Sequence, residues 1–350
     1  MTRRTLLAGL PAMAAPLRLP RKIRCALLGL DGHAGEVLTP LPQLPDVEMV
    51  ALADPEPKTL ARYARNPHLA KAKQYADWRK MLDSEKIDVV GICNANSEHA
   101  GAILACLDRK IHVISEKPIA TELADLDKVR RAVEKGSAKF TAMLPMRFSP
   151  PYLALKQIVA SGELGDIVQI DAQKSYQPAP RPAWYFKRAT YGGTMAWIGI
   201  HMVDLMIHIS QRDMTEAFGF QNHLGFPETG DTENVTATVF RLDNGGVALL
   251  RMDYLRPKTS GSHGDDRLRL TGLKGIAEYM AATGVTVMSD NRSSRDVVTQ
   301  LPPSRHLFVD FLNHIYNAGP DPIPWKEIVR GHQIVLGARD AMEKKRIMKL

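Results

Sequence analysis

Continuous apolar runs alternate with segments of helical periodicity over the first 150 residues. The runs at residues 23–30, 47–53, 89–93, 112–115 and 139–143 are typical of strands that are buried on both faces. Between them, amphipathic spacing predicts helices at residues 32–41, 58–66, 78–82, 98–107 and 123–134. Strands that alternate with helices in this way predict a parallel sheet covered by helices on both faces.

Longer extended stretches follow residue 150 and change the pattern. A helix at 152–160 precedes runs with strand character at residues 167–176, 216–224, 234–242, 247–254 and 268–273. Asp243-Asn244-Gly245-Gly246 is a hairpin turn between two of them, and further helices are predicted at 202–210, 308–316 and 326–344. We therefore predict an α/β protein with a doubly wound Rossmann domain at 21–145. A second α/β domain at 146–350 has an open, mostly antiparallel sheet, and its last helices can pack back on the first domain.

The composition fits a globular protein of this size and excludes several classes of partner. Of 350 residues, 45% are hydrophobic and 24% are charged, and the formal charge is +8. The basic residues are scattered, so we expect no nucleic-acid partner. No stretch approaches the roughly 20 apolar residues that a membrane span requires, so we expect no span. Neither the three cysteines nor the histidines have metal-site spacing, so no metal is expected.

Residues 1–20 resemble a targeting segment rather than part of the fold. Arg3-Arg4 precedes an apolar run that ends in Ala12-Met13-Ala14, as in a twin-arginine signal with an A-x-A cleavage site. This pattern predicts export to the periplasm. The alternative is a basic, frayed N-terminus on a cytoplasmic enzyme.

A glycine-rich turn follows the first predicted strand and indicates a dinucleotide site. Gly29, Leu30, Asp31, Gly32 and His33 form the turn, although Asp31 takes the place of the second glycine in the G-x-G-x-x-G/A pattern. At the end of the second strand, Asp54 is suited to accept hydrogen bonds from the adenosine ribose and to repel a 2′-phosphate. The motif favours NAD over NADP. The alternative for Asp54 is a helix-capping role.

Glu116-Lys117-Pro118 ends the fifth predicted strand and is the strongest candidate for chemistry. Desolvation lowers the pKa of a buried lysine, so that it can accept or donate a proton near neutral pH. Hydride transfer at a carbinol carbon needs such a group for the hydroxyl proton. The alternative interpretation is a strand end followed by a turn proline.

The order of these motifs resembles the glucose–fructose oxidoreductase and inositol dehydrogenase (Gfo/Idh/MocA) family. Glu116-Lys117-Pro118 matches its most specific motif, and residues 93–99 (CNANSEH) resemble its strand-four loop. Arg147-Phe148 and the segment from Gly192-Gly193 to His201 match further family motifs. The resemblance covers nearly the whole mature chain. It implies an NAD(P)-binding Rossmann domain and a sheet domain that often makes oligomer contacts, and so a homo-oligomer, a dimer or tetramer.

The resemblance also implies roles for individual residues. Lys117 would be the catalytic lysine, and His201 would be its partner across the substrate. The cofactor would be bound near its nicotinamide end by Asn94, Asn96, His99, Glu116 and Arg147. Apart from the resemblance, Trp184 and Tyr185 follow the first extended stretch and are candidates either to line a sugar-sized pocket or to form a hydrophobic plug between the domains. Trp197 and Asp204 are further candidates for the substrate site.

One position departs from the family pattern. Many family dehydrogenases carry an aspartate four residues before the histidine, where this chain has Trp197. An indole accepts no proton, but its face can stack on a sugar ring or simply pack in the core. Asp204 can lie on the same helix face as His201 and orient it, or it can pair locally.

Three functions remain open from the sequence. The first is an NAD(P)-dependent oxidoreductase that acts on the CH–OH group of a sugar, a polyol or a derivative. The second is a glycosidase or lyase that oxidises its substrate transiently with bound NAD, and the third is a non-catalytic nucleotide- or sugar-binding relative.

Overall fold

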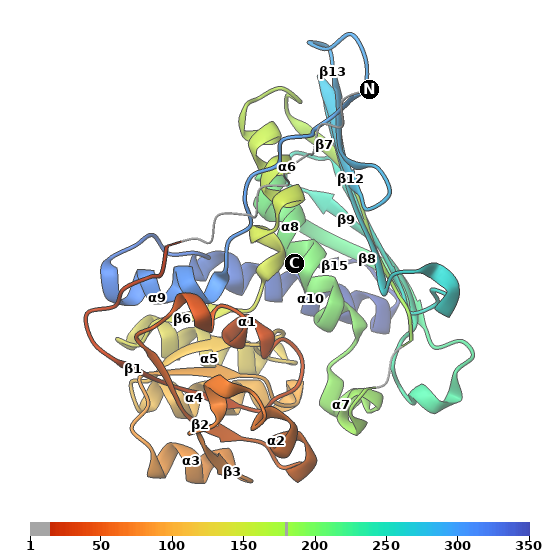
Figure 1. The fold of residues 1–350 in the computed structure, drawn as a ribbon. Coiled ribbons are helices and arrows are strands. Elements are labelled where there is room, and N and C mark those ends of the chain that lie inside the picture. Colours follow the sequence, from red (N-terminus) through yellow and green to blue (C-terminus); the bar gives the residue numbers. More distant parts are fainter. Residues whose placement is uncertain (1–14, 179–180) are drawn as a thin grey trace, which may run out of the picture.

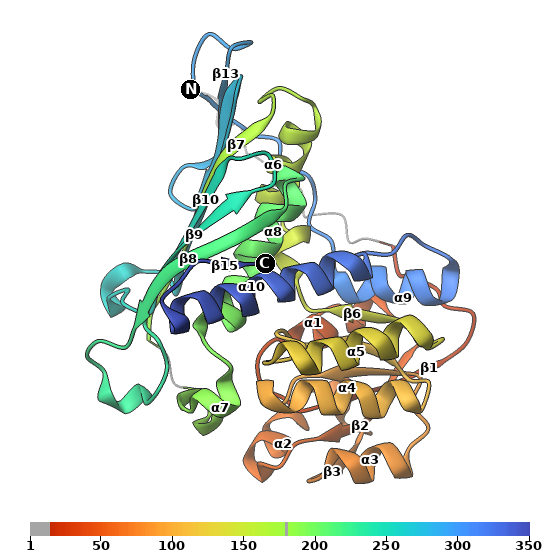
Figure 2. The same cartoon turned by 180° about the vertical axis from the view of Figure 1, so that it is seen from behind.

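The chain forms two lobes in the computed structural model, which describes residues 15–178 and 181–350. One lobe is a sheet with helices on both faces, and the other is a broad sheet with helices on its inner face (Figures 1 and 2). The predicted export signal lies mostly in residues 1–14, outside the described residues.

The first lobe contains a six-stranded parallel sheet in the order β3-β2-β1-β4-β5-β6. Its strands are β1 (Ile23–Leu28), β2 (Val47–Ala53), β3 (Lys73–Tyr75), β4 (Val89–Ile92), β5 (His112–Ser115) and β6 (Phe140–Ala142). All five predicted strands are present, because an apolar run is needed where both faces of a strand are covered. The edge strand β3 was not predicted, since its three residues are polar or only half-buried.

Helices cover both faces of this sheet, as the alternating pattern predicts (Figure 2). They are α1 (Gly35–Leu38), α2 (Pro57–Tyr63), α3 (Trp78–Ser84), α4 (His99–Asp108) and α5 (Leu123–Lys135). The prediction of one helix over residues 32–41 was wrong, because α1 is a single turn. Gly32 has a φ of +57°, which no right-handed helix contains, so the helix begins only after this residue.

The second lobe contains a nine-stranded sheet in the order β14-β13-β12-β11-β7-β10-β9-β8-β15. Its strands are β7 (Ile167–Tyr176), β8 (Met214–Asn222), β9 (Val235–Leu242), β10 (Val247–Asp253), β11 (Gly264–Gly272), β12 (Gly275–Met280), β13 (Gly284–Ser289), β14 (Asp296–Val297) and β15 (Met348–Lys349). Only β7 and β10 pair in parallel, so the predicted fold class is confirmed. Strands β12 to β15 were not predicted. Strands β14 and β15 have two residues each and most residues of β12 are only partly buried, whereas β13 is largely buried and was missed.

The remaining helices are α6 (Pro150–Ala160), α7 (Arg188–Tyr191), α8 (Ile200–Ser210), α9 (Leu307–Asn317) and α10 (Trp325–Lys344). Of these helices, α10 joins the two lobes. Helix α10 packs against α8 and β8 of the second lobe and against α5 and β6 of the first, while α9 contacts α1. Both views show these two helices lying between the lobes (Figures 1 and 2).

The strand order fixes where a ligand can bind in the first lobe. The order reverses between β1 and β4, and ligands of doubly wound sheets bind outside the carboxyl ends of the strands at such a point. The turns after β1, β2, β4 and β5 meet at this edge. Within the described residues, no helix has the length and apolarity that a membrane crossing needs.

Candidate active site

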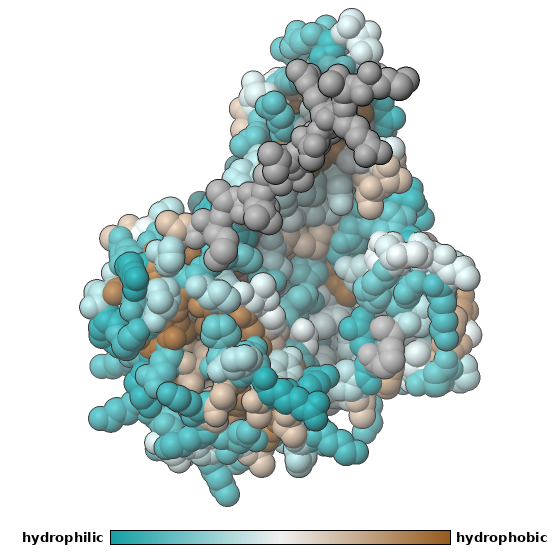
Figure 3. Space-filling model, viewed as in Figure 1, coloured by the Kyte–Doolittle hydropathy of each residue, from teal (hydrophilic) through white to brown (hydrophobic). Residues whose placement is uncertain are grey.

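A cleft of about 680 Å³ lies at this edge of the sheet, between the two lobes. Its first wall contains residues from the turns after β1, β2 and β4, including Gly29, Asp54 and Asn94. Its second wall is a segment of the other lobe that contains Trp184 and Thr190. The space-filling view shows a largely hydrophilic face that is hollowed between the lobes (Figure 3).

The glycine turn is packed tightly against the loop after β4. Gly29 has a φ of +75°, and a Cβ there would lie 2.3 Å from the backbone nitrogen of Asn94. Glycine is therefore required at this position for two independent reasons. Asp31, in the place of the second glycine, accepts a 3.0 Å hydrogen bond from the indole nitrogen of Trp184. This bond ties the turn to the second lobe.

Asp54 follows β2 and faces the cleft. Its two carboxylate oxygens accept hydrogen bonds from the backbone nitrogens of Leu30 (3.0 Å) and Glu56 (2.9 Å). Burial raises the pKa of this carboxyl. A carboxylate has about four acceptor positions, so acceptor capacity is left for ribose hydroxyls. The N-cap of α2 is Glu56, so Asp54 holds the turn rather than the helix end.

The loop after β4 presents two asparagines with unused acceptors. The side-chain nitrogen of Asn94 donates to Glu98 (2.8 Å), and that of Asn96 donates to the carbonyl of Tyr191 (2.7 Å). Their side-chain oxygens are buried and have no partner among the described residues. A buried polar atom without a partner is costly, so these oxygens are suited to a bound ligand.

His99 positions this loop rather than facing the cleft. The residue is fully buried, with Nδ1 2.7 Å from the carbonyl of Pro118 and Nε2 3.0 Å from the carbonyl of Asn94. Burial lowers the pKa of His99, so the neutral ring donates to one carbonyl at a time. His99 thereby connects the β4 loop to the turn that carries Lys117.

Lys117 is buried immediately after β5, where its ammonium contacts Trp197 and Glu116. Its ammonium donates to the carbonyl oxygen of Trp197 (2.8 Å), lies 3.4 Å from the centre of the Trp197 ring system, and is 3.5 Å from Glu116 Oε1. Burial lowers the pKa of Lys117 to about 8, and the charges of Lys174 and Arg181 act in the same direction. The lysine can therefore change its protonation state near neutral pH.

Glu116 points back to the glycine turn. Both of its carboxylate oxygens contact Nδ1 of His33, at 2.7 and 2.8 Å. Burial acts to raise the pKa of Glu116, but His33 and Lys117 outweigh burial and hold it below its ordinary value. A Cβ at Gly32 would lie 3.1 Å from Glu116 Oε1, so the turn also fits closely around this carboxylate.

His201 faces the same region from α8. Its ring lies edge-on to His33 with 5.5 Å between centroids, and its buried Nδ1 has no partner in the described part of the chain. Burial and the nearby Lys117 and Lys174 hold the pKa of His201 well below its usual value. The ring is therefore neutral and able to donate or accept a hydrogen bond.

Lys174 is a residue of this region that we did not predict. It is fully buried on β7 and donates to Asp266 (2.8 Å). Burial acts to lower its pKa, but Tyr176 and Asp266 outweigh burial and raise it, so Lys174 stays charged. The sequence carries a signal for it, since Ile170, Ala172 and Lys174 alternate along one face of a strand that is otherwise apolar there.

The structure places Asp204 and Arg147 in an ion pair with each other rather than in the cleft. Two guanidinium nitrogens of Arg147 contact the Asp204 carboxylate at 2.5 and 2.7 Å, and both side chains are almost fully buried. Arg147 also binds Glu327 (2.6 Å). Asp204 therefore pairs with a residue of another element, so the structure shows neither of the two roles expected from the sequence, a local pair or orientation of His201.

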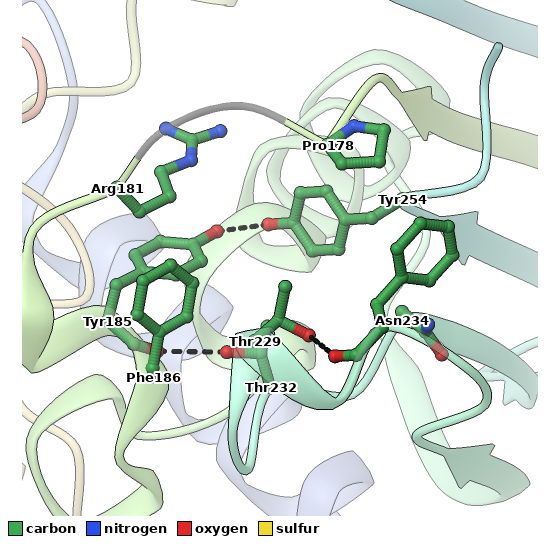
Figure 4. Close-up of a pocket in the computed structure, with 9 residues that line it drawn as sticks. Pro178, Arg181, Tyr185, Phe186, Thr229, Thr232, Asn234 and Tyr254 are labelled. Carbon is green, nitrogen blue, oxygen red and sulfur yellow. Dashed lines mark hydrogen bonds between the residues drawn. The ribbon is translucent and has the colours of Figure 1, made fainter.

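The three aromatic residues predicted for the substrate pack against one another but face different spaces. Trp184 lines the cleft, and Trp197 covers Lys117. Tyr185 lines a separate pocket with Arg181, Phe186 and Tyr254, where its hydroxyl bonds to that of Tyr254 (Figure 4). That pocket holds about 30 Å³, which suits one water molecule and is too small for a sugar ring.

The cleft has the features that a dinucleotide needs. A tight glycine turn, the acidic residue after β2 and the two unpaired asparagine oxygens lie along the carboxyl edge of the sheet. Lys117 and Glu116 lie at the end of the next strand, β5. The residues present therefore fit NAD(P), with Asp54 at the adenosine end and Lys117 at the nicotinamide end.

Comparison with known proteins supports this arrangement. Residues 23–143 match the model of an oxidoreductase family with an NAD-binding Rossmann fold (GFO_IDH_MocA), and residues 152–278 match a GFO/IDH/MocA C-terminal domain. The chain is 25% identical over 339 residues to the myo-inositol 2-dehydrogenase of Thermotoga maritima, an alignment that covers 94% of this chain and 98% of the relative.

Comparison with solved structures also finds similarity to oxidoreductases. A putative oxidoreductase from Thermotoga maritima superposes with a TM-score of 0.88 at 31% identity, covering 94% of this chain and 100% of that one. A levoglucosan dehydrogenase in complex with NADH superposes with a TM-score of 0.79 at 17% identity, covering 93% and 98%, and this likeness concerns the fold alone. With both family domains matched in order, this chain belongs to the Gfo/Idh/MocA family of oxidoreductases.

Proposed function

We propose that this protein is an NAD-dependent dehydrogenase that moves a hydride between NAD and the CH–OH group of a sugar, a polyol or a derivative. The observation that carries the proposal is Lys117. It lies buried at the carboxyl end of β5 with a pKa of about 8, and the neutral His201 faces the same region. A proton-transfer group of this kind is what oxidation of a carbinol requires beside a nicotinamide.

The cofactor, Lys117 and His201 have different roles in the oxidation of the substrate. NAD, when bound, supplies the acceptor for the hydride. The neutral amine of Lys117 takes the hydroxyl proton as the carbinol carbon is oxidised, and in the reverse direction its ammonium returns this proton to the carbonyl oxygen. His201 is neutral, and its Nδ1 has no partner within the described residues, so it can hydrogen-bond the same oxygen and hold it beside Lys117. Burial of Lys117 and His201 keeps water away from the reacting atoms.

Two considerations support the choice of substrate and cofactor. Relatives with similar sequences or folds are named for oxidation of inositols and levoglucosan, which are cyclic polyhydroxy compounds. At the adenosine end, the cleft is lined by Asp54 and Glu56, whose negative charges disfavour the 2′-phosphate of NADP. We therefore propose NAD as the preferred cofactor.

The test is turnover by purified protein over a panel of inositols, aldoses and anhydrosugars, with NAD or NADP and detection of the reduced nicotinamide. We expect Lys117→Met to lower kcat by about 100- to 10,000-fold, which is typical of a lost general base. Lys135→Met, at an exposed position near the end of α5, is the matched control. Full turnover by Lys117→Met would exclude the assignment. Cleaved glycoside without net NADH would favour the transient-oxidation alternative instead.

We also propose that the protein is exported and self-associates. The twin-arginine pattern supports export, and a secretion assay with Arg3-Arg4 replaced by Lys-Lys tests it.

Exposed apolar side chains on the outer face of the nine-stranded sheet, including Phe220, Val239 and Val247, support contacts between copies. Light scattering tests this proposal, and a strictly monomeric protein would contradict it.

A further inference from the structure

Lys117 needs a route by which its proton can leave, and its contacts restrict that route. Of the groups around the ammonium, the carbonyl oxygen and the indole ring of Trp197 bind the charge but are too weakly basic to take the proton. Glu116, whose Oε1 lies 3.5 Å away, is a base. This separation is a few tenths of an ångström longer than an ordinary hydrogen bond.

A route through Nδ1 of His201 reaches no acceptor among the described residues. Its Nδ1 is buried without a partner in the described residues, and its side chain lies among the cationic Lys117 and Lys174. The nearest candidate carboxylate on its own helix, Asp204, is held by Arg147. Within the described residues, Nδ1 of His201 therefore has no base behind it.

A route through Glu116 reaches the surface. The Glu116 carboxylate contacts Nδ1 of His33 with both oxygens, and the His33 side chain is 37% exposed. Lys117 and Glu116 are each only 1% exposed. The three side chains thus form a continuous path from a buried amine to solvent.

We propose that Glu116 and His33 conduct the proton between Lys117 and solvent. This inference rests on the proposed dehydrogenase function. After oxidation of the substrate, the Lys117 ammonium gives its proton to Glu116. Glu116 passes it to Nδ1 of His33 in the tautomer that carries its own proton on Nε2, and the resulting imidazolium releases the Nε2 proton to water. Exchange of the exposed ring with water restores the accepting tautomer, so one proton leaves for each hydride transferred. The path runs in reverse for reduction. Neither residue touches the reacting atoms, and both act through Lys117.

The charged groups around the path act on both the donor and the acceptor. Lys174 and Arg181 make the Lys117 ammonium more acidic, while His33, Lys117 and His99 lower the pKa of Glu116, so Glu116 holds the proton only transiently before His33 takes it. His99 lies on the other side of Glu116, and Glu36 and His201 flank His33. The only carboxylate in direct contact with Lys117 in the described chain is Glu116.

The first test needs no cofactor. Difference infrared spectra between the protein and its Glu116→Gln variant isolate the carboxyl band of Glu116. We expect the Glu116 carboxyl to become protonated at a higher pH in both His33→Gln and Lys117→Met, since each variant removes a group that lowers its pKa. If the band titrates identically in His33→Gln and in the unmodified protein, Glu116 and His33 are not coupled and the path is overturned.

The second test asks whether His33 carries protons. We expect His33→Gln to lower kcat about ten-fold or more and added imidazole to restore it, with a rate that follows the basicity of the imidazole used. His68→Gln, at an exposed histidine remote from the cleft, is the control. Loss of activity without rescue would assign His33 a structural role only. Absence of any turnover in the unmodified protein would contradict the proposed function, while the infrared result would still decide the coupling.

Discussion

At the scale of single residues, the protonation of Lys117 sets the pH at which the protein works. Because the neutral amine accepts the hydroxyl proton, kcat/KM for oxidation should rise with pH and level off above the Lys117 pKa of about 8. Reduction uses the ammonium, so its rate should fall over the same interval. A pH–rate profile in both directions measures this, with Lys117→Arg expected to be inactive because arginine stays protonated. A flat profile across this interval would contradict the role of Lys117.

At the scale of elements, the turn after β1 depends on the close approach of Gly29 to the loop after β4. Gly29→Ala introduces a Cβ at a φ of +75° and 2.3 Å from a backbone nitrogen. We expect it to lower the free energy of unfolding by at least about 1–2 kcal/mol, from the left-handed conformation alone, and to weaken NAD binding. Urea denaturation and calorimetric titration measure the two effects.

Gly101→Ala is the matched control for this substitution. Gly101 lies inside α4, and a Cβ there would have no neighbour within 4 Å. Alanine favours a helix over glycine, so this variant should gain up to about 1 kcal/mol. A Gly29→Ala protein as stable as the unmodified one would mean that the turn adapts.

The contact between α8 and the segment before α6 depends on a buried ion pair. Asp204→Asn keeps the shape of the side chain but leaves Arg147 with only Glu327 as a carboxylate partner. We expect a loss of about 3 kcal/mol in the free energy of unfolding, since a buried charge is left partly unpaired. Asp125→Asn removes a solvent-exposed pair with Lys128 and should cost less than about 0.5 kcal/mol. Equal effects of the two variants in urea denaturation would refute the difference.

At the scale of the whole molecule, the two lobes meet across the cleft at Trp184 and Asp31. Trp184→Phe keeps a ring in place but removes the hydrogen bond to Asp31. The loss of about 1 kcal/mol should speed release of NADH about five-fold, which stopped-flow fluorescence measures. Trp325→Phe is the control, because the indole nitrogen of Trp325 has no partner among the described residues. An unchanged release rate in Trp184→Phe would show that this contact does not close the cleft.

The sequence by itself determined the order of strands and helices and the edge at which the site lies. Apolar runs and helical spacing are properties of neighbouring residues, so β2, β5 and β7 have the predicted bounds. The chain order of these elements then places Gly29, Asp54 and Lys117 at the carboxyl ends of parallel strands. This is why a few local motifs were enough for the fold and for the cofactor cleft.

The tertiary structure alone decided which side chains meet at that site. Asp204 pairs with Arg147 across 57 residues, Trp184 with Asp31 across 153, and His33 with Glu116 across 83. Such partners are set by how elements pack within a lobe, or between the lobes for Trp184 and Asp31, and no local spacing encodes them. A buried charged side chain pairs with the group that the fold places next to it, because leaving the charge unpaired costs several kcal/mol. The roles of Asp204, Trp197 and His33 therefore emerged only when the whole chain was folded.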